Sequence, residues 1–151
     1  HSLQVCDIAQ RLFSLNVHGQ FAALMHDAHE AYCSDMASPT KGLLGTAWEY
    51  LESRLQNTLR SAFALHGTAT HHAAQIKQAD LIALATERAQ LMPTSPTPWP
   101  ILLHVQPADW VDLMDRGRQQ MTWRDWAAAF KDKADELDFA RNEGMFKVVQ
   151  P

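Results

Sequence analysis

The stretch ALMHDAHEAYCSD (residues 23–35) places two histidines, one glutamate and two aspartates within ten positions of an apolar segment. Imidazole nitrogens and carboxylate oxygens are donors that divalent ions commonly take in proteins. The adjacent His26 and Asp27 supply one donor of each kind from neighbouring positions. Two ligands make a weak site, so the sequence must supply further donors from elsewhere.

Apolar residues recur at the spacing of one helix face over most of the chain, and no segment alternates as a strand would. A first helix is predicted from the segment HSLQVCDIAQRLF at residues 1–13. A second contains the 23–35 stretch, with a loop at His18 and Gly19 between the two. On one continuous helix, His26 and Glu30 lie one turn apart and their side chains converge.

Further helices are predicted downstream of this stretch. Thr46 and Glu49 have the spacing of a capping box at the start of a long amphipathic helix. Another helix is expected over about 71–92, followed by PTSPTPWP (93–100) as an extended loop. C-terminal helices are expected at about 106–140. The first opens at Pro107 and carries Trp110, Leu113 and Met114, and the last is lined by Trp123, Phe130 and Leu137.

Length and composition favour one domain over residues 1–151, with 46% hydrophobic residues for a single core. The net charge of −4 provides no basic field for a nucleic acid polymer or a membrane surface, so the expected partner is a small molecule. Two cysteines without CxxC spacing favour a reducing, cytoplasmic location. No apolar run approaches the ~18 residues of a membrane span, and we expect no signal peptide.

Asp80 lies on the inner line of the predicted helix at about 71–92, and a carboxylate among apolar neighbours needs a partner. Asp80 and His1 are the candidates that would complete the donor pair of His26 and Asp27. Two imidazoles and two carboxylates suit a borderline or hard divalent ion with open positions for water and substrate. A closed structural zinc site is the less suitable alternative.

The order of these residues resembles the HD-domain metal-dependent phosphohydrolases. The likeness rests on the leading HS, on HDAHEAYCSDMASPTK at 26–41 and on IKQAD at 76–80. It is greatest to the 5′-deoxynucleotidases and to the short phage enzymes that hydrolyse deoxynucleoside triphosphates, and it covers residues 1 to about 92, the expected metal-site core. It implies an all-α helical bundle of the HD type, a divalent ion (Co, Mn, Zn, Mg or Fe), a bacterial or phage-infected cytoplasm, and a homo-oligomer.

The resemblance also implies roles for individual residues. It makes metal ligands of His1, His26, Asp27 and Asp80, gives Glu30 a catalytic role, and places Asp35 and Lys41 beside the substrate. By its chemistry, Glu30 can orient the attacking water and pass on its proton, and Asp35 can share this work. Lys41 and Lys77 can each offer a positive charge to phosphate oxygens. In such families a segment ahead of the first histidine contributes to substrate recognition, and the present sequence starts at His1.

The predicted reaction is metal-dependent hydrolysis of a nucleotide phosphate ester. A (deoxy)nucleoside 5′-monophosphate is the favoured substrate, and a deoxynucleoside triphosphate is the alternative because both reactions use the same ligands. The sequence lacks the Glu-Asp pair of guanosine-tetraphosphate hydrolases, a Gly-Tyr-Pro element and the His-Glu-x-x-His of zincins. A non-catalytic helical binding module would explain the helices but not the ordered ligand-type residues.

Overall fold

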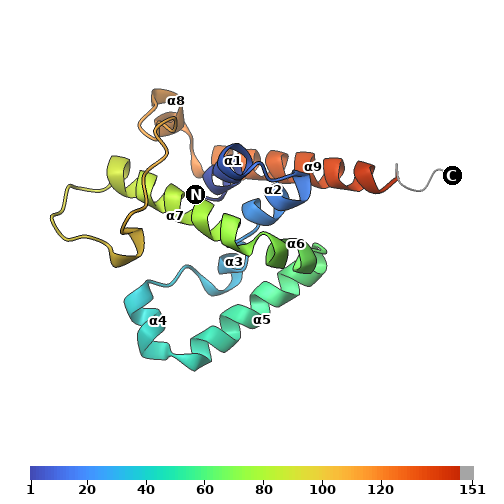
Figure 1. Ribbon diagram of the computed structural model, residues 1–151, viewed down its shortest axis with the longest axis horizontal. Helices are drawn as coiled ribbons and strands as arrows, with labels where there is room; N and C mark the ends of the chain where they lie inside the picture. The colour runs from blue at the N-terminus through green and yellow to red at the C-terminus, as the bar shows by residue number, and fades with distance from the viewer. Residues whose placement is uncertain (147–151) are drawn as a thin grey trace.

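The computed structural model describes residues 1–146, and over that range the chain forms helices and no strand (Figure 1). The all-α class predicted from the sequence is therefore confirmed, while the HD type stays a prediction. The elements in chain order are α1 (Ser2–Phe13), α2 (Val17–Leu24), α3 (Glu30–Cys33), α4 (Ser38–Leu44), α5 (Thr46–Ala62), α6 (His66–His71), α7 (Ala73–Leu91), the 3₁₀ helix η1 (Pro100–Leu102), α8 (Arg116–Gln120) and α9 (Trp123–Phe146).

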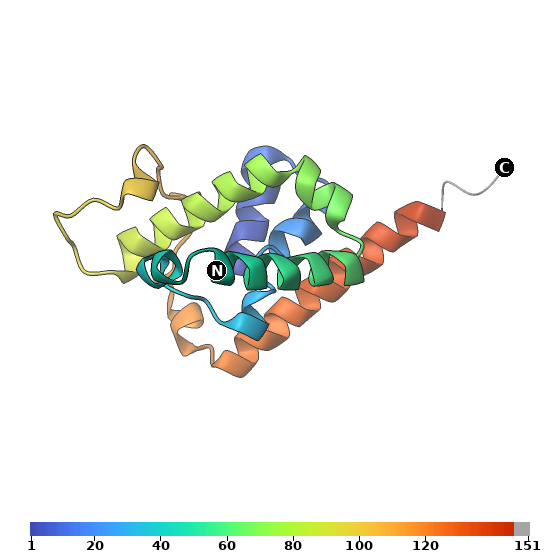
Figure 2. The same ribbon diagram turned by 90° about the horizontal axis from the view of Figure 1, so that it is seen from below.

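The core forms where α1 packs against α2 and α7. Val5, Ile8, Phe21 and Leu24 are almost completely buried there, and each such side chain contributes ~1.5–3 kcal/mol on leaving water. Helix α9 runs past α1 and α2 and buries Leu137 against them (Figure 2). The packing of α1 against α7 places the start of the chain beside the middle of α7.

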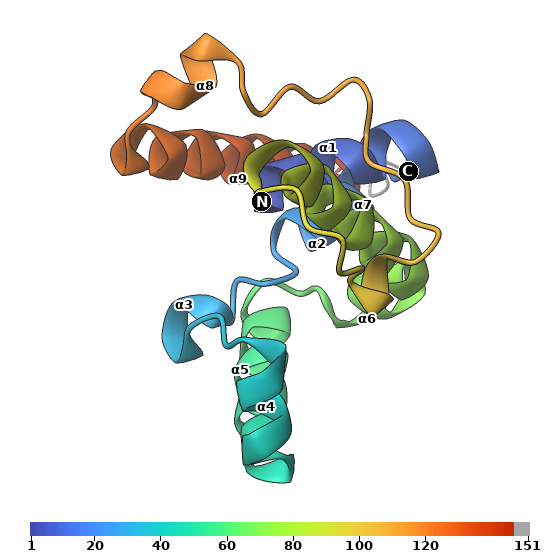
Figure 3. The same cartoon turned by 90° about the vertical axis from the view of Figure 1, so that its left-hand side faces the viewer.

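Helices α4 and α5 stand away from this packed body (Figure 3). The main contacts of α5 are with α3, α4 and α6, and of these three helices α6 contributes Ala69 to the buried core. Trp48 is the buried residue of α5, whereas Leu43 of α4 is 88% exposed. The α4–α5 pair therefore forms an arm, and the end of α5 next to α6 lies against the body.

The structure corrects the prediction of one helix through the 23–35 stretch. His18 and Gly19 lie inside α2, and the break before it contains Ser14, with φ +51, and Asn16, which caps α2. Helix α2 ends at Leu24, and a turn leads to α3 at Glu30. The ring of His26 donates from Nδ1 to the Ala23 carbonyl (2.9 Å), which also accepts the His26 backbone N–H (3.4 Å) in this turn.

Two further boundaries differ from those predicted. Gly45, at φ +55, is the N-cap of α5, so Thr46 is already helical and the predicted capping box with Glu49 does not form. The helix expected at about 71–92 is confirmed as α7, and the proline-rich loop after it is extended up to η1. In the part of the chain that the structure describes, no helix is long and apolar enough to cross a membrane.

The helix predicted to open at Pro107 is absent, and residues 103–115 contain no helix. Side chains of α7 hold this backbone instead. The Thr86 hydroxyl accepts a hydrogen bond from the Ala108 N–H (2.9 Å), and Gln90 bonds the backbone of both Val111 and Leu113. The last predicted helix exists as α9, but Trp123 at its start is 70% exposed rather than buried.

Replacing Thr86 by valine should lower the free energy of unfolding by about 1–3 kcal/mol, because the buried Ala108 N–H would lose its acceptor. Urea unfolding of T86V measures this loss. Thr58 provides the control, because its exposed hydroxyl bonds only a carbonyl of its own helix, so T58V should change stability by less than ~0.5 kcal/mol. Equal unfolding midpoints for the two variants would contradict the role of Thr86.

Candidate metal centre

The four predicted ligands come together from three separate segments. His1 precedes α1, His26 and Asp27 lie in the turn after α2, and Asp80 faces them from the middle of α7. One donor atom from each side chain lies within 4.8 Å of all the others. We call these four residues the His–Asp cluster. The structure thus brings together the residues expected to do so, and metal binding by them stays a prediction.

Packing of α1 on α7 delivers His1 to the cluster. Ala79 and Ala83 are fully buried, and these small side chains leave room for α1 to lie close to α7. The His1 Nε2 lies 3.0 Å from an Asp80 oxygen, and its Nδ1 lies 2.9 Å from a Glu87 oxygen. Glu87, which the sequence places on the same inner line of the helix as Asp80, orients the His1 ring from two turns further along α7.

The metal-free form of His1 carries a proton at neutral pH. Hydrogen bonds to Asp80 and Glu87, outweighing burial, raise its pKa to about 10. A histidine must be deprotonated to bind a metal, so an ion would replace the proton that lies between His1 and Asp80.

One ring nitrogen of His26 bonds a backbone carbonyl, and the other lies near the carboxylates of the cluster. Its Nδ1 lies 2.9 Å from the Ala23 carbonyl oxygen, so we assign the proton of the neutral ring to Nδ1 and a lone pair to Nε2. That Nε2 is buried and lies 2.8 Å from Asp27 Oδ2, but it makes no hydrogen bond of acceptable geometry. It also lies 3.9 Å from Asp80 Oδ1.

The contact between His26 and Asp27 is unfavourable unless a positive charge lies between them. A lone pair and a carboxylate oxygen repel each other at 2.8 Å when no proton is aligned between them. A cation bound by both atoms would relieve this repulsion and satisfy the unpartnered Nε2. The residues present therefore fit a divalent ion, which two imidazoles and two carboxylates would hold.

Both carboxylates of the cluster are ionised at neutral pH. Burial would raise the pKa of Asp80, but hydrogen bonds from His1 and Lys77 outweigh it and lower the pKa to about 2. Burial opposes ionisation of Asp27 as well, but a proton on the neighbouring His26 Nε2 would outweigh it, so that the pKa of Asp27 lies below its usual value in the metal-free chain. The Lys77 ammonium donates to Asp80 Oδ2 at 2.7 Å, and this places the predicted substrate-binding lysine beside the cluster.

Glu30 lies beside the cluster rather than in it. It opens α3, three positions after Asp27, and its carboxylate groups with His29 and Glu52 within 4.8 Å. Burial, followed by the charges of Asp27 and Asp35, raises its pKa to about 6. A carboxylate with this pKa, close to the proposed ligands but outside them, has the properties of a general base near neutral pH.

The remaining predicted site residues, Asp35 and Lys41, lie outside the His–Asp cluster. Asp35 is exposed between α3 and α4, and its charge acts on Glu30 and on Lys41. The Lys41 ammonium donates a hydrogen bond to Glu52 on α5 at 2.8 Å, and this bond raises the pKa of Lys41. His29, to which sequence analysis gave no role, is 5% exposed and its Nε2 lies 3.6 Å from the same Glu52 oxygen. Glu52 therefore links the turn of the cluster to the arm.

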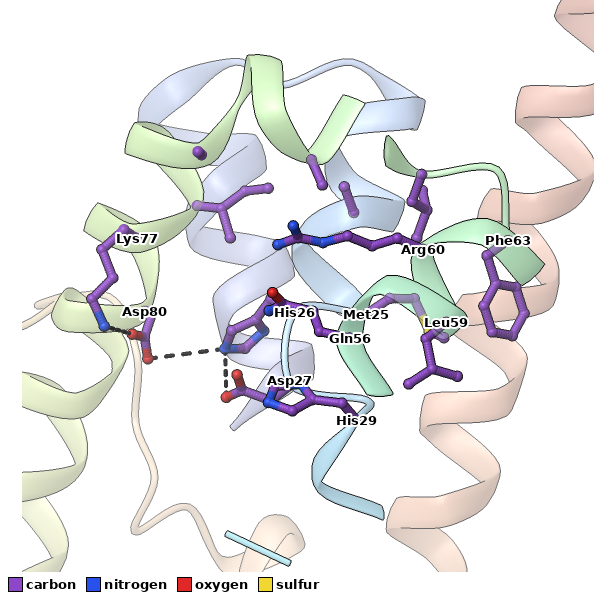
Figure 4. Close-up of a pocket in the computed structure, with 15 residues that line it drawn as sticks. Met25, His26, Asp27, His29, Gln56, Leu59, Arg60, Phe63, Lys77 and Asp80 are labelled. Atoms are coloured by element: carbon purple, nitrogen blue, oxygen red, sulfur yellow. Dashed lines mark hydrogen bonds and ion pairs between the residues drawn. The ribbon is translucent and has the colours of Figure 1, made fainter. Parts of the chain in front are cut away.

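A cavity of about 260 Å³ opens beside the cluster (Figure 4). Its polar side contains His26, Asp27, Asp80 and Lys77, and the end of α5 supplies its opposite wall. The apolar part of the wall comprises Leu59, Phe63, Leu65, Ala69, Ala73 and Ile76. Sequence analysis missed Gln56 and Arg60, which lie one helical turn apart on α5 and also line the cavity.

Comparison with known proteins gives one partial match and no family. No family profile matches the chain, and no solved structure matches it. A protein of Escherichia coli strain K12, described as "uncharacterized protein YfdR", is 40% identical over 82 residues. The match covers 54% of this chain and 44% of that relative, so the chain spans less than half the relative's length. This likeness indicates common ancestry for the aligned part and carries no activity.

Asp80→Asn should abolish most of the stabilisation that a divalent ion gives the folded chain. At a free ion concentration of 100 times Kd, binding to the folded state raises the free energy of unfolding by ~2.7 kcal/mol. For a chain of this size, that corresponds to a rise of roughly 5–10 °C in Tm. Thermal unfolding with manganese, cobalt, zinc, magnesium or iron(II), each followed by chelator, measures this increment for the parent and for D80N.

Asp132, exposed on α9, provides the matched control, so D132N should respond to the ions as the parent does. Equal ion-induced shifts in D80N and the parent would remove Asp80 from the ligand set. A parent whose Tm none of the ions changes would contradict metal binding altogether.

Proposed function

We propose that this protein is a metal-dependent phosphohydrolase that acts on a nucleotide, with a (deoxy)nucleoside 5′-monophosphate as the favoured substrate. The observation that carries the proposal is the His–Asp cluster, in which the buried His26 Nε2 and an Asp27 oxygen meet at 2.8 Å without a hydrogen bond. The resemblance of the ordered motif to HD-domain phosphohydrolases adds the reaction class and the nucleotide.

In the proposed reaction, the ion and the protein side chains have separate roles. A divalent ion bound by the cluster would supply Lewis acidity and a water of lowered pKa. Glu30, with a pKa of about 6, accepts a proton from the attacking water and returns it to the leaving oxygen. Lys77 offers its ammonium to the phosphate from the α7 side, where it now donates to Asp80.

Two other interpretations make different demands on the cavity. A triphosphate substrate carries two further phosphates, which would need cationic partners beyond Lys77 and Arg60, the lysine and the arginine that line the cavity. A non-catalytic binding module would use the cavity and an ion without any role for Glu30. The monophosphate fits best because it places one charged group at the polar side and an uncharged nucleoside against the apolar wall.

Self-association remains part of the proposal. Large apolar side chains are exposed on the arm at Leu43, Leu44, Tyr50 and Leu51, and on α9 at Trp123 and Phe139. The arm and α9 therefore each offer an apolar surface for a second copy. Light scattering coupled to size exclusion measures the mass of the particle.

Glu30→Gln should lower kcat by roughly 10²- to 10⁴-fold while the ion-induced rise in Tm is kept. The substitution preserves shape and removes the capacity to accept a proton. In the parent, kcat/KM should rise with pH as Glu30 loses its proton, and E30Q should lack this limb of the profile. Phosphate release from ribo- and deoxynucleoside mono- and triphosphates, with phosphate, pyrophosphate and triphosphate resolved, gives the rates.

Glu49→Gln is the matched control, because Glu49 is an exposed carboxylate on α5 away from the cavity, and its rate should equal that of the parent. E30Q turning over at the parent rate would remove Glu30 from the mechanism. A parent that binds the ion but hydrolyses nothing on the panel would favour the binding module, and release of triphosphate alone would favour the triphosphohydrolase.

A further inference from the structure

Arg60 brings an unpaired positive charge into the cavity from α5. It lies in the last turn of that helix, is half-buried, and lines the same cavity as His26, Lys77 and Asp80. In Figure 4 its side chain reaches from α5 into the cavity, toward the side formed by α7. No carboxylate and no carbonyl within residues 1–146 accepts a hydrogen bond or ion pair from its guanidinium.

The other cations near the site are already engaged. Lys77 donates to Asp80 at 2.7 Å, and Lys41 donates to Glu52 at 2.8 Å. Arg54, on the same helix as Arg60, lies over the Tyr50 ring at 5.7 Å and does not line the cavity. A guanidinium enclosed by a cavity wall without an anionic partner is most favourably satisfied by an anion that enters from solvent.

The charges that line the cavity specify the anion. A divalent ion would balance Asp27 and Asp80, and Lys77 with Arg60 would then leave two positive charges facing the cavity. A phosphate monoester carries about −1.5 to −2 at neutral pH, which matches this excess. Without the ion, the two cations would only balance the two carboxylates, and the cavity would hold no excess charge for an anion.

We propose that Arg60 binds the phosphate group of the substrate from the α5 wall, across the cavity from Lys77, and so selects a phosphate dianion. This inference rests on the proposed function for the identity of the ligand. The planar guanidinium can donate two parallel hydrogen bonds to phosphate oxygens, whereas the Lys77 ammonium contributes a point charge. Gln56, one turn earlier on α5, lies on the same wall and remains free to contact the nucleoside.

The test compares a charged and an uncharged ligand on the ion-loaded protein. The charged probe is the phosphonate analogue of deoxyadenosine 5′-monophosphate, which cannot be hydrolysed, and the uncharged probe is deoxyadenosine. Calorimetry should show Arg60→Gln weakening phosphonate binding about 10- to 100-fold while leaving deoxyadenosine binding within twofold. R60K should recover part of the loss, since it restores charge without the bidentate geometry. Unchanged Tm in R60Q would show that the fold is intact.

Arg54→Gln and Arg118→Gln are the controls. R54Q removes a charge from the same helix outside the cavity, and R118Q removes one from a second cavity of about 310 Å³ that His1 and Glu87 also line. Both should bind the phosphonate as the parent does. The inference is overturned if R60Q binds the phosphonate like the parent, if it loses both probes equally, if R118Q loses the phosphonate instead, or if the parent does not bind it.

Failure of this inference is separable from failure of the proposed function. A parent that binds the phosphonate through Arg60 and hydrolyses no nucleotide would retain the phosphate site and reject the enzyme. R60Q hydrolysing the nucleotide with the parent KM would retain the enzyme and reject Arg60 as its phosphate ligand.

Discussion

The enclosure of two ionised carboxylates in one partly buried space is the constraint on which the rest of the structure depends. Asp27 and Asp80 offer oxygens within 4.8 Å of each other, and unit charges at about 4 Å repel by about 4 kcal/mol at an effective dielectric of 20. His1 and Lys77 offset part of this repulsion in the metal-free chain. The attraction between His1 and Asp80 also ties the start of α1 to the middle of α7, so the charges of the site and the packing of the core support each other.

The same constraint explains the local shape of the chain around the motif. The Ala23 carbonyl near the end of α2 accepts both the backbone N–H and the ring Nδ1 of His26, so one carbonyl closes the turn and fixes the tautomer of the ring. Ending the helix at Leu24 places His26 and Asp27 in the turn that faces Asp80 of α7. The turn also sends the chain out to the arm. The arm returns through α5 to build the far wall of the cavity, where Arg60 lies.

Sequence order predicted the membership of the cluster because the donors are chemically distinctive, even though 79 positions separate His1 from Asp80. The periodicity of apolar residues could not predict the break after Leu24, because it reports the spacing of apolar side chains and not the hydrogen bonds that individual carbonyl groups accept. It also predicted a helix from Pro107, but this segment is not helical. Its backbone N–H groups instead bond the side chains of Thr86 and Gln90, which lie more than twenty positions away in the sequence. Arg60 was missed because nothing in the sequence of α5 reveals that its last turn faces α7 across a cavity.

The central claim, that His1, His26, Asp27 and Asp80 hold a divalent ion, is tested most directly by anomalous scattering from crystals grown with manganese and measured at two wavelengths around the manganese edge. The account predicts one strong peak among the four side chains, within about 2.0–2.3 Å of the His26 Nε2 and of an oxygen of each aspartate. A difference map without a peak at the cluster, from crystals that contain manganese, would contradict it.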